Sequence, residues 1–144
     1  MNYAHLLTRI EHAGVFHMPM DGEAALIDAA EHNGYGVFRV DLAQATTKAA
    51  MLDAIARAMN FPEWFGHNWD ALMDCLADMG WQPAEGYVVI LEHCDGIHGH
   101  AEADFVQTLQ VFESAAGEWR EQGIPFWCFV DMQADGISWL SDIA

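Results

Sequence analysis

Two nearly uninterrupted apolar runs, with a long helical pattern between them, limit the folds open to this chain most strongly. YVVIL at 87–91 and IPFWCFV at 124–130 are typical of strands covered on both faces. Between them, residues 103–122 carry apolar side chains at helical spacing, namely Phe105, Leu109, Phe112, Ala116 and Trp119. Because neighbouring parallel strands need long crossover connections, this order predicts an α/β domain with a parallel sheet.

Shorter patterns extend the alternation of helices and strands toward the N-terminus. Residues 15–18 fit a brief strand, and the alternating YGVFRVDL at 35–42 predicts a first core strand. Helices are expected over residues 2–13, 23–32, 48–59 and 69–79. In the last of these, Asn68 is the expected N-cap and Gly80 the expected end. Residues 92–101 are expected to form a loop.

The chain is strongly acidic, with 22 Asp and Glu residues against 5 Lys and Arg and a net charge of −17. So few cations argue against nucleic acid or an anionic membrane as a direct partner. A hydrophobic content of 53% argues against disorder. The charge therefore belongs to a folded surface, where it either keeps the protein soluble or attracts a basic partner.

The cysteines and the N-terminus bear on the compartment. Cys75, Cys94 and Cys128 are widely spaced and form no C-x-x-C motif, so neither a disulfide framework nor a zinc knuckle is predicted. The first residues lack the features of a secretory signal, and the longest wholly apolar run, 125–130, is too short to span a bilayer. We expect a soluble cytoplasmic protein without a cofactor.

The expected helix at 69–79 has two distinct faces. Its apolar side carries Ala71, Leu72, Cys75, Leu76 and Met79. On the opposite side lie Asp70, Asp74 and Ala77, flanked by Met73 and Asp78. The helix dipole favours Asp70 in the first turn, but it does not account for Asp74, which repels Asp70 from one turn away.

Aromatic residues surround this acidic face. Trp64 and Phe65 precede the helix and Trp81 follows it, and aromatics beside charges are typical of protein interfaces. Alternatively, the aromatics belong to the core and the aspartates to an ordinary solvated surface.

The segment PEWFGHNWDALMDCL at 62–76 resembles the signature of the barstar family, intracellular protein inhibitors of secreted ribonucleases of the barnase type. The resemblance continues through GW at 80–81, YVVILE at 87–92 and LQVFESA at 109–115, and covers roughly residues 35–131. It implies a small α/β fold with a three-stranded parallel sheet in an inhibitor domain at 35–144. Residues 1–34 are then an extension packed on the core, which covers a sheet edge, enlarges the core or adds a second contact surface.

The resemblance also implies roles for single residues in a non-enzymatic inhibitor of a basic ribonuclease. Asp74 is expected to take the place of substrate phosphate, Asp70 to add a second charge contact and Trp64 to stack near the catalytic histidine. Asn68, Met73, Gly80 and Trp81 are expected to support these contacts, and Phe65 and Asp78 complete the predicted set. A glutamate common in the family aligns with Val106, and Glu102 or Asp104 is a possible replacement.

Four other functions compete with this interpretation. One is an acidic module for a basic partner that is not a nuclease. A metal-dependent hydrolase is suggested by EHCDGIHGH at 92–100, although no familiar ligand spacing is present. Asp70 and Asp74 as an acid–base pair, or Cys75 as a nucleophile, are further enzymatic options, but an exposed helix face and a core-facing thiol disfavour them.

Overall fold

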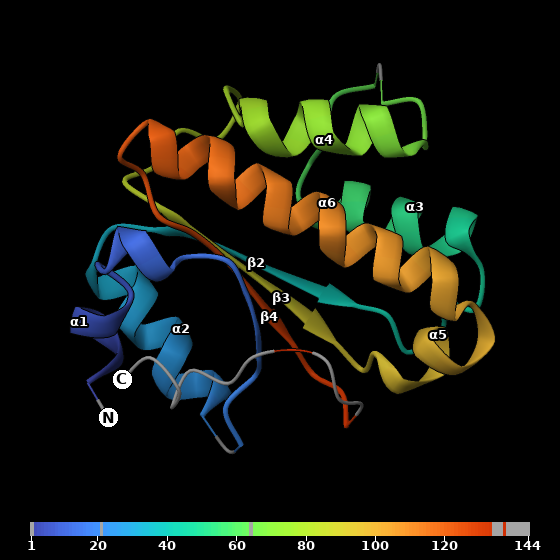
Figure 1. Cartoon of the computed structure of the whole chain (residues 1–144), viewed down its shortest axis with the longest axis horizontal. Coiled ribbons are helices and arrows are strands. Elements are labelled where there is room, and N and C mark those ends of the chain that lie inside the picture. The colour runs from blue at the N-terminus through green and yellow to red at the C-terminus, as the bar shows by residue number, and fades with distance from the viewer. Residues whose placement is uncertain (1, 21, 64, 134–136, 138–144) are drawn as a thin grey trace.

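The computed structural model describes residues 2–20, 22–63, 65–133 and 137, which form a three-layer α/β structure (Figure 1). Its sheet has the strand order β1 (Val15–His17), β4 (Phe126–Val130), β3 (Tyr87–Glu92) and β2 (Gly36–Asp41). All neighbouring strands are parallel. The predicted α/β class with a parallel sheet is confirmed.

The expectation of three strands is wrong, because the described sheet contains four. The added strand, β1, pairs with the outer edge of β4, with Val15 opposite Cys128 and His17 opposite Val130. It comes from the N-terminal segment, outside the part of the chain on which the three-strand expectation rests. A three-residue strand is too short for alternation to reveal its pairing.

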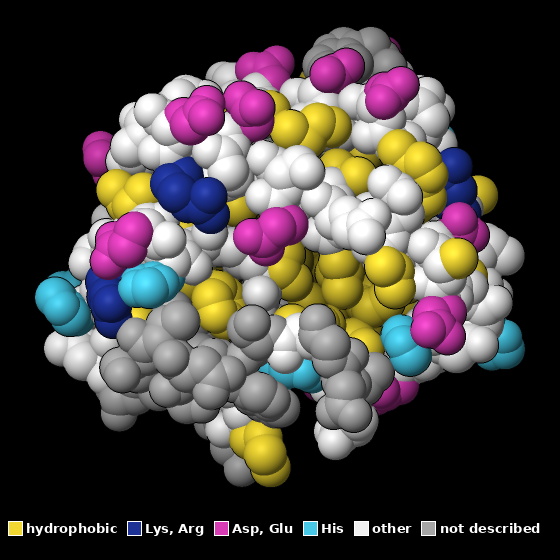
Figure 2. All heavy atoms as spheres, viewed as in Figure 1, with side chains coloured by type: hydrophobic (Ala, Val, Ile, Leu, Met, Phe, Trp, Pro, Cys, Tyr) yellow, Lys and Arg dark blue, Asp and Glu magenta, His cyan; other side chains and the backbone are white. Residues whose placement is uncertain are grey.

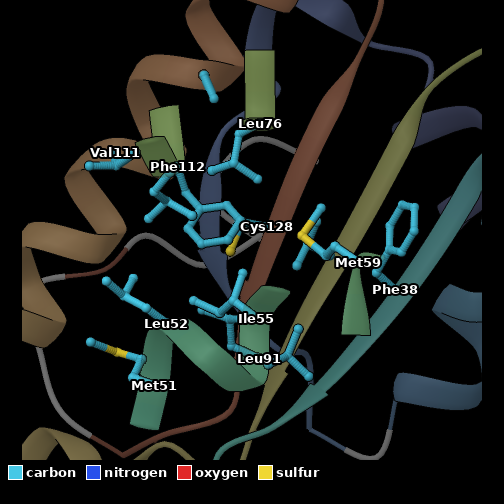
Figure 3. Packing of buried hydrophobic residues seen from close by; sticks show 14 of the residues in the cluster. Phe38, Met51, Leu52, Ile55, Met59, Leu76, Leu91, Val111, Phe112 and Cys128 are labelled. Carbon is cyan, nitrogen blue, oxygen red and sulfur yellow. The ribbon is translucent and has the colours of Figure 1, made fainter. Parts of the chain in front are cut away.

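Three helices cover one face of the sheet: α3 (Lys48–Ala58), α4 (Trp69–Asp78) and α6 (Glu102–Glu121) (Figure 1). Side chains from all three meet the sheet in one buried cluster (Figure 3). Leu52 and Ile55 of α3, Leu76 of α4 and Phe112 of α6 are fully buried there. The apolar stripes predicted for these helices therefore form the main core.

The opposite face is covered by the N-terminal elements, α1 (Tyr3–Leu6), the 3-10 helix η1 (Ile10–His12) and α2 (Glu23–His32). A second cluster there buries Leu7 and Leu26 against Val88 and Trp127. The N-terminal segment thus covers a sheet edge through β1 and enlarges the core through its helices. The division of the chain into domains at residue 34 stays a prediction.

Several element bounds differ from those expected. Helix α2 has its predicted bounds, but the helix expected over 2–13 is interrupted after α1. The Leu7 carbonyl accepts hydrogen bonds from Trp127 Nε1 at 3.0 Å and Tyr35 Oη at 3.2 Å, in place of the backbone N–H that a continuing helix would supply.

The loop expected at 92–101 contains a short helix, α5 (Asp95–His100). Ile97 anchors it, because its side chain is fully buried where α5 packs on α6. Among the described residues, no helix combines the length and the hydropathy needed to cross a membrane.

Candidate functional site

Helix α4 begins where the sequence predicts, at the Asn68 cap. Asn68 Oδ1 accepts a hydrogen bond of 2.8 Å from the Ala71 backbone N–H, and its Nδ2 donates to the Gly66 carbonyl at 3.4 Å. One side chain therefore satisfies a free N–H of the first turn and fixes the preceding loop to the helix.

The inner face of α4 is locked into the core. Leu72, Cys75 and Leu76 have no exposed surface. From α6, Trp119 Nε1 donates a buried hydrogen bond of 2.7 Å to the Leu76 carbonyl. This indole satisfies an acceptor near the end of α4, where the helix has no backbone donor to offer. Packing and this hydrogen bond together hold the helix in one orientation.

The outer face of α4 presents a row of three exposed carboxylates, Asp70, Asp74 and Asp78. They are spaced by four residues, so each lies about 6 Å further along the helix axis than the last. Within the described part of the chain, none of the three forms an ion pair with a basic side chain. In the space-filling view, carboxylates stand along the rim on which Figure 1 places α4 (Figure 2).

Nearby cations are engaged elsewhere. Lys48 Nζ lies 4.3 Å from the centre of the Trp69 ring, a cation–π contact at the margin of α4. Arg57 pairs with Asp53 within α3. The negative charge of the outer face is therefore not neutralised by these two neighbours.

The helix ends in a left-handed residue, and this residue is Met79 rather than Gly80. Met79 has φ 49°, its N–H donates to the Cys75 carbonyl at 3.2 Å, and its side chain is 1% exposed. Burial of this side chain offsets the backbone strain. Gly80 N–H donates to Asp78 Oδ1 at 3.2 Å, and a Cβ at position 80 would lie 3.0 Å from that oxygen. Glycine thus leaves room for the Asp78 carboxylate.

The aromatics flanking α4 form a connected group. Phe61 contacts Phe65 and Trp81, with ring centres 5.1 and 6.0 Å apart. Trp81 is partly buried, and its Nε1 donates to the Met59 carbonyl at 3.2 Å. Phe65 is only 7% exposed, so its side chain supports the loop from beneath. Trp64 lies outside the described residues.

Backbone strain is concentrated around this helix. Four described residues other than glycine have positive φ, and three of them, Asn60, His67 and Met79, lie in the turns around α4. Such conformations persist only where the surrounding structure enforces them, and they cluster at functional sites. None of the three is a glycine, the residue that most readily adopts a positive φ.

The residues considered as substitutes for the family glutamate lie on α6. Val106 is 43% exposed and lines a cavity of about 720 Å³, together with residues of β1 such as Val15. Glu102 and Asp104 lie in the first turn of α6, where the helix dipole favours carboxylates. Whether either one contacts a partner stays a prediction.

The histidine-rich segment makes separate contacts. His93 Nδ1 lies 2.9 Å from Asp41 Oδ1, whereas the His98 ring packs edge-on against Phe105. Among the described residues, no three His, Cys, Asp or Glu side chains are grouped as a metal site requires.

The Cys75 thiol is poorly suited to be a nucleophile. Burial, together with the smaller effect of the charges of Asp74 and Asp78, raises the pKa of Cys75 to about 11. Because the thiolate is the reactive form, a thiol with this pKa stays protonated near neutral pH.

Comparison with known proteins places these features in a family. The family model for barstar (barnase inhibitor) matches residues 35–131, which include α4, its flanking loops, α6 and strands β2, β3 and β4. A comparison with curated proteins gave no match. The family match spans more than half of the chain, and we conclude that the chain belongs to the barstar family of barnase inhibitors.

Proposed function

We propose that this protein inhibits a basic ribonuclease of the barnase type and that the outer face of α4 is the inhibitory surface. The observation that carries the proposal is the row Asp70, Asp74 and Asp78, which is exposed on a helix whose inner face is buried and has no basic ion-pair partner among the described residues. Its charges are pre-positioned, so binding does not need to order the helix.

The chemistry of a phosphate-binding site fits this row. A carboxylate can accept paired hydrogen bonds from an arginine fork, as a phosphate group does. Asp74 stands at the centre of the row, one helical turn from Asp70 and from Asp78. We assign it the position of the substrate phosphate, with Asp70 as the second charge contact and Asp78 at the end of the row.

The flanking residues are assigned supporting roles. Met73 and Trp81 are partly buried beside the row and offer apolar surface that excludes water from the paired charges. Gly80 and Asn68 hold the ends of the helix, and Phe65 supports the loop that precedes it. Trp64 is assigned its stacking role from the family resemblance alone.

The overall charge of −17 suits a basic partner, because it speeds encounter and makes association sensitive to salt. Barnase with barstar is itself a standard example of such charge-steered association, so steering is an expectation carried over from the family.

The proposal is tested by adding increasing amounts of the full chain to a barnase-type ribonuclease and measuring the rate of RNA cleavage that remains. Asp74→Asn removes one charge from the inhibitory surface, and Asp28→Asn removes one exposed charge from α2 on the opposite layer. We expect Asp74→Asn to weaken inhibition by about 2–5 kcal/mol and Asp28→Asn to leave it nearly unchanged. Equal inhibition by both variants would show that α4 is not the inhibitory surface. Failure of the unmodified chain to inhibit any such nuclease would instead favour a basic non-nuclease partner.

A further inference from the structure

The two edges of the sheet differ in how their backbone groups are satisfied. At one edge, β1 is three residues long, and the Val15 N–H, which points away from β4, donates to Glu113 Oε2 at 2.9 Å. At the other edge, β2 is six residues long, and within the described part of the chain it pairs only with β3.

The hydrogen bonds at the ends of β2 show which backbone groups face outward. Gly36 N–H donates to the Gly86 carbonyl and Leu42 N–H to the Glu92 carbonyl, both at 2.9 Å. In a parallel ladder the even-numbered residues of β2 therefore face β3, and Val37, Arg39 and Asp41 face away. Among the described residues, the outward N–H and C=O groups of these three have no hydrogen-bond partner.

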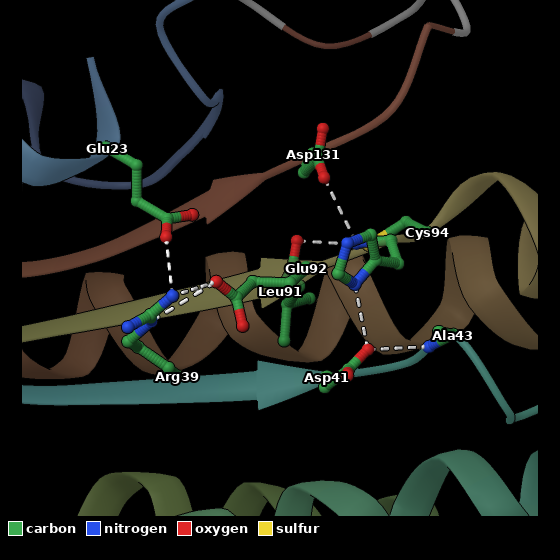
Figure 4. A network of polar contacts seen from close by, with 9 residues as sticks. Glu23, Arg39, Asp41, Ala43, Leu91, Glu92, Cys94 and Asp131 are labelled. Carbon is green, nitrogen blue, oxygen red and sulfur yellow. Dashed lines mark hydrogen bonds and ion pairs between the residues drawn. The ribbon is translucent and has the colours of Figure 1, made fainter. Parts of the chain in front are cut away.

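Charged side chains usually protect such an edge, but here they are held toward the sheet. Arg39 bonds to Glu92 of β3 at 2.8 Å and to Glu23 of α2 at 2.9 Å. Asp41 accepts from the Ala43 N–H at 2.9 Å and contacts His93 at the same distance (Figure 4). The contacts of both side chains run along or across the sheet, so the backbone edge of β2 is left open to another strand.

We propose that β2 binds an extended, basic segment of a partner protein as an added strand. The outward groups recur every second residue, about 7 Å apart, which is the spacing that an added strand offers. In the contact network at this corner, four carboxylates, Glu23, Asp41, Glu92 and Asp131, outnumber the two basic side chains of the described residues drawn there, Arg39 and His93. A basic side chain opposite Asp41 and an apolar one opposite Val37 would complement the edge.

Charge also disfavours a second copy of the chain as the partner that adds a strand to β2. Each copy carries −17, so edge-to-edge pairing would bring two strongly acidic molecules together. This surface is separate from the α4 row, and the proposal does not depend on ribonuclease inhibition.

The experiment measures amide hydrogen exchange in the full chain by NMR, with and without an acetylated nine-residue peptide of alternating lysine and valine. At a peptide concentration of about ten times its Kd, exchange at residues 37, 39 and 41 should slow about tenfold. The exchange rates of the amides of residues 38 and 40, which already bond to β3, should change little. A peptide with glutamate in place of lysine tests charge, and peptides N-methylated at alternate residues test backbone pairing.

A matched pair of variants at Val37 tests the role of its outward N–H donor. Proline is tolerated on an edge strand where its missing N–H faces outward, so Val37→Pro should weaken peptide binding about fivefold while the ladder to β3 remains. Val37→Ala loses the same packing but keeps the N–H, and it should bind like the unmodified chain. The N-methylated peptides provide the same test if Val37→Pro fails to fold.

Three results would overturn the proposal. The first is no protection at residues 37, 39 and 41 under saturating peptide. The second is protection that maps to α4 and is lost in Asp74→Asn, which would assign peptide binding to the inhibitory surface. The third is a concentration-dependent dimer in sedimentation experiments that protects the same amides without peptide.

Discussion

The indole nitrogen of Trp119 on α6 lies 2.7 Å from the carbonyl oxygen of Leu76 on α4, and this buried hydrogen bond couples the two helices. Trp119→Phe leaves the carbonyl unpaired and removes part of a packed ring, so stability should fall by about 2–4 kcal/mol. Urea unfolding measures this change. We also expect weaker ribonuclease inhibition, because α4 loses a constraint on its orientation.

Trp127 provides the matched control for that variant. Its Nε1 also donates to a buried carbonyl, that of Leu7 at 3.0 Å, but in the layer opposite α4. The Leu7 carbonyl keeps its hydrogen bond from Tyr35 Oη, so Trp127→Phe should cost somewhat less stability than Trp119→Phe and leave inhibition by the folded protein unchanged. An equal loss of inhibition in both variants would mean that the Trp119 hydrogen bond does not position α4 specifically.

The acidic row on α4 should show opposite effects on stability and affinity. Asp74 has a like-charged neighbour one turn away on each side, and each such pair costs about 0.2–0.5 kcal/mol. Asp74→Asn should therefore raise the free energy of unfolding slightly while it weakens inhibition. Thermal unfolding at low and high salt measures the first effect, and the gain should shrink as salt screens the repulsion. A loss of stability in Asp74→Asn would show that the carboxylate has a structural role.

The sequence predicts the part of the site that depends on local rules. The Asn68 cap and the two faces of α4 follow from residue types and helical spacing, and the apolar runs at 87–91 and 124–130 predict the central strands. The features it does not predict depend on contacts between distant residues. The first helix is interrupted where the Leu7 carbonyl accepts a hydrogen bond from Trp127, which lies 120 positions further along the chain. Phe65 is buried because it packs on Phe61.

The three cysteines should be unreactive in the folded protein. All three are free and buried, and burial raises the pKa of each thiol, to about 11 for Cys75. A disulfide reagent at pH 7.5 should therefore modify no thiol rapidly in the native protein and three in denaturant. Rapid modification of one thiol under native conditions would indicate local opening, and its position would identify the element that opens.

The contact between His93 and Asp41 should make stability depend on pH. The hydrogen bond and charge of Asp41 raise the pKa of His93 above its ordinary value of 6.5. A raised pKa means that the folded state binds the proton more tightly. The stability that His93 contributes is therefore complete below about pH 6.5 and is lost as pH rises through the pKa of the folded state. The pKa of Asp41 is lowered, mainly by the hydrogen bond from the Ala43 N–H and to a smaller extent by His93. The stability that Asp41 contributes is therefore lost as pH falls through its lowered pKa.

Both contributions are present together on the mildly acidic side of neutrality, so this contact should stabilise the protein most in that pH range. Urea midpoints between pH 4 and pH 9 should show a decline above about pH 6.5 that is smaller in His93→Gln. Asp41→Asn should return the NMR titration of His93 toward its ordinary pKa. An unchanged titration in Asp41→Asn would contradict the role given to this contact.

The N-terminal segment should be required for folding, although it precedes the part of the chain that matches the family. Its helices cover Val88, Ile90, Trp127 and Phe129 on one face of the sheet, and all four side chains are fully buried. Deletion of residues 1–34 would expose this face together with the edge of β4 that β1 covers. Because an exposed apolar face of this kind promotes association, the shortened chain should aggregate or bind a hydrophobic dye. Leu7→Ala in the full chain is a milder test, expected to cost about 2–5 kcal/mol. A monomeric, dye-free product with native circular dichroism would show that residues 35–144 fold independently.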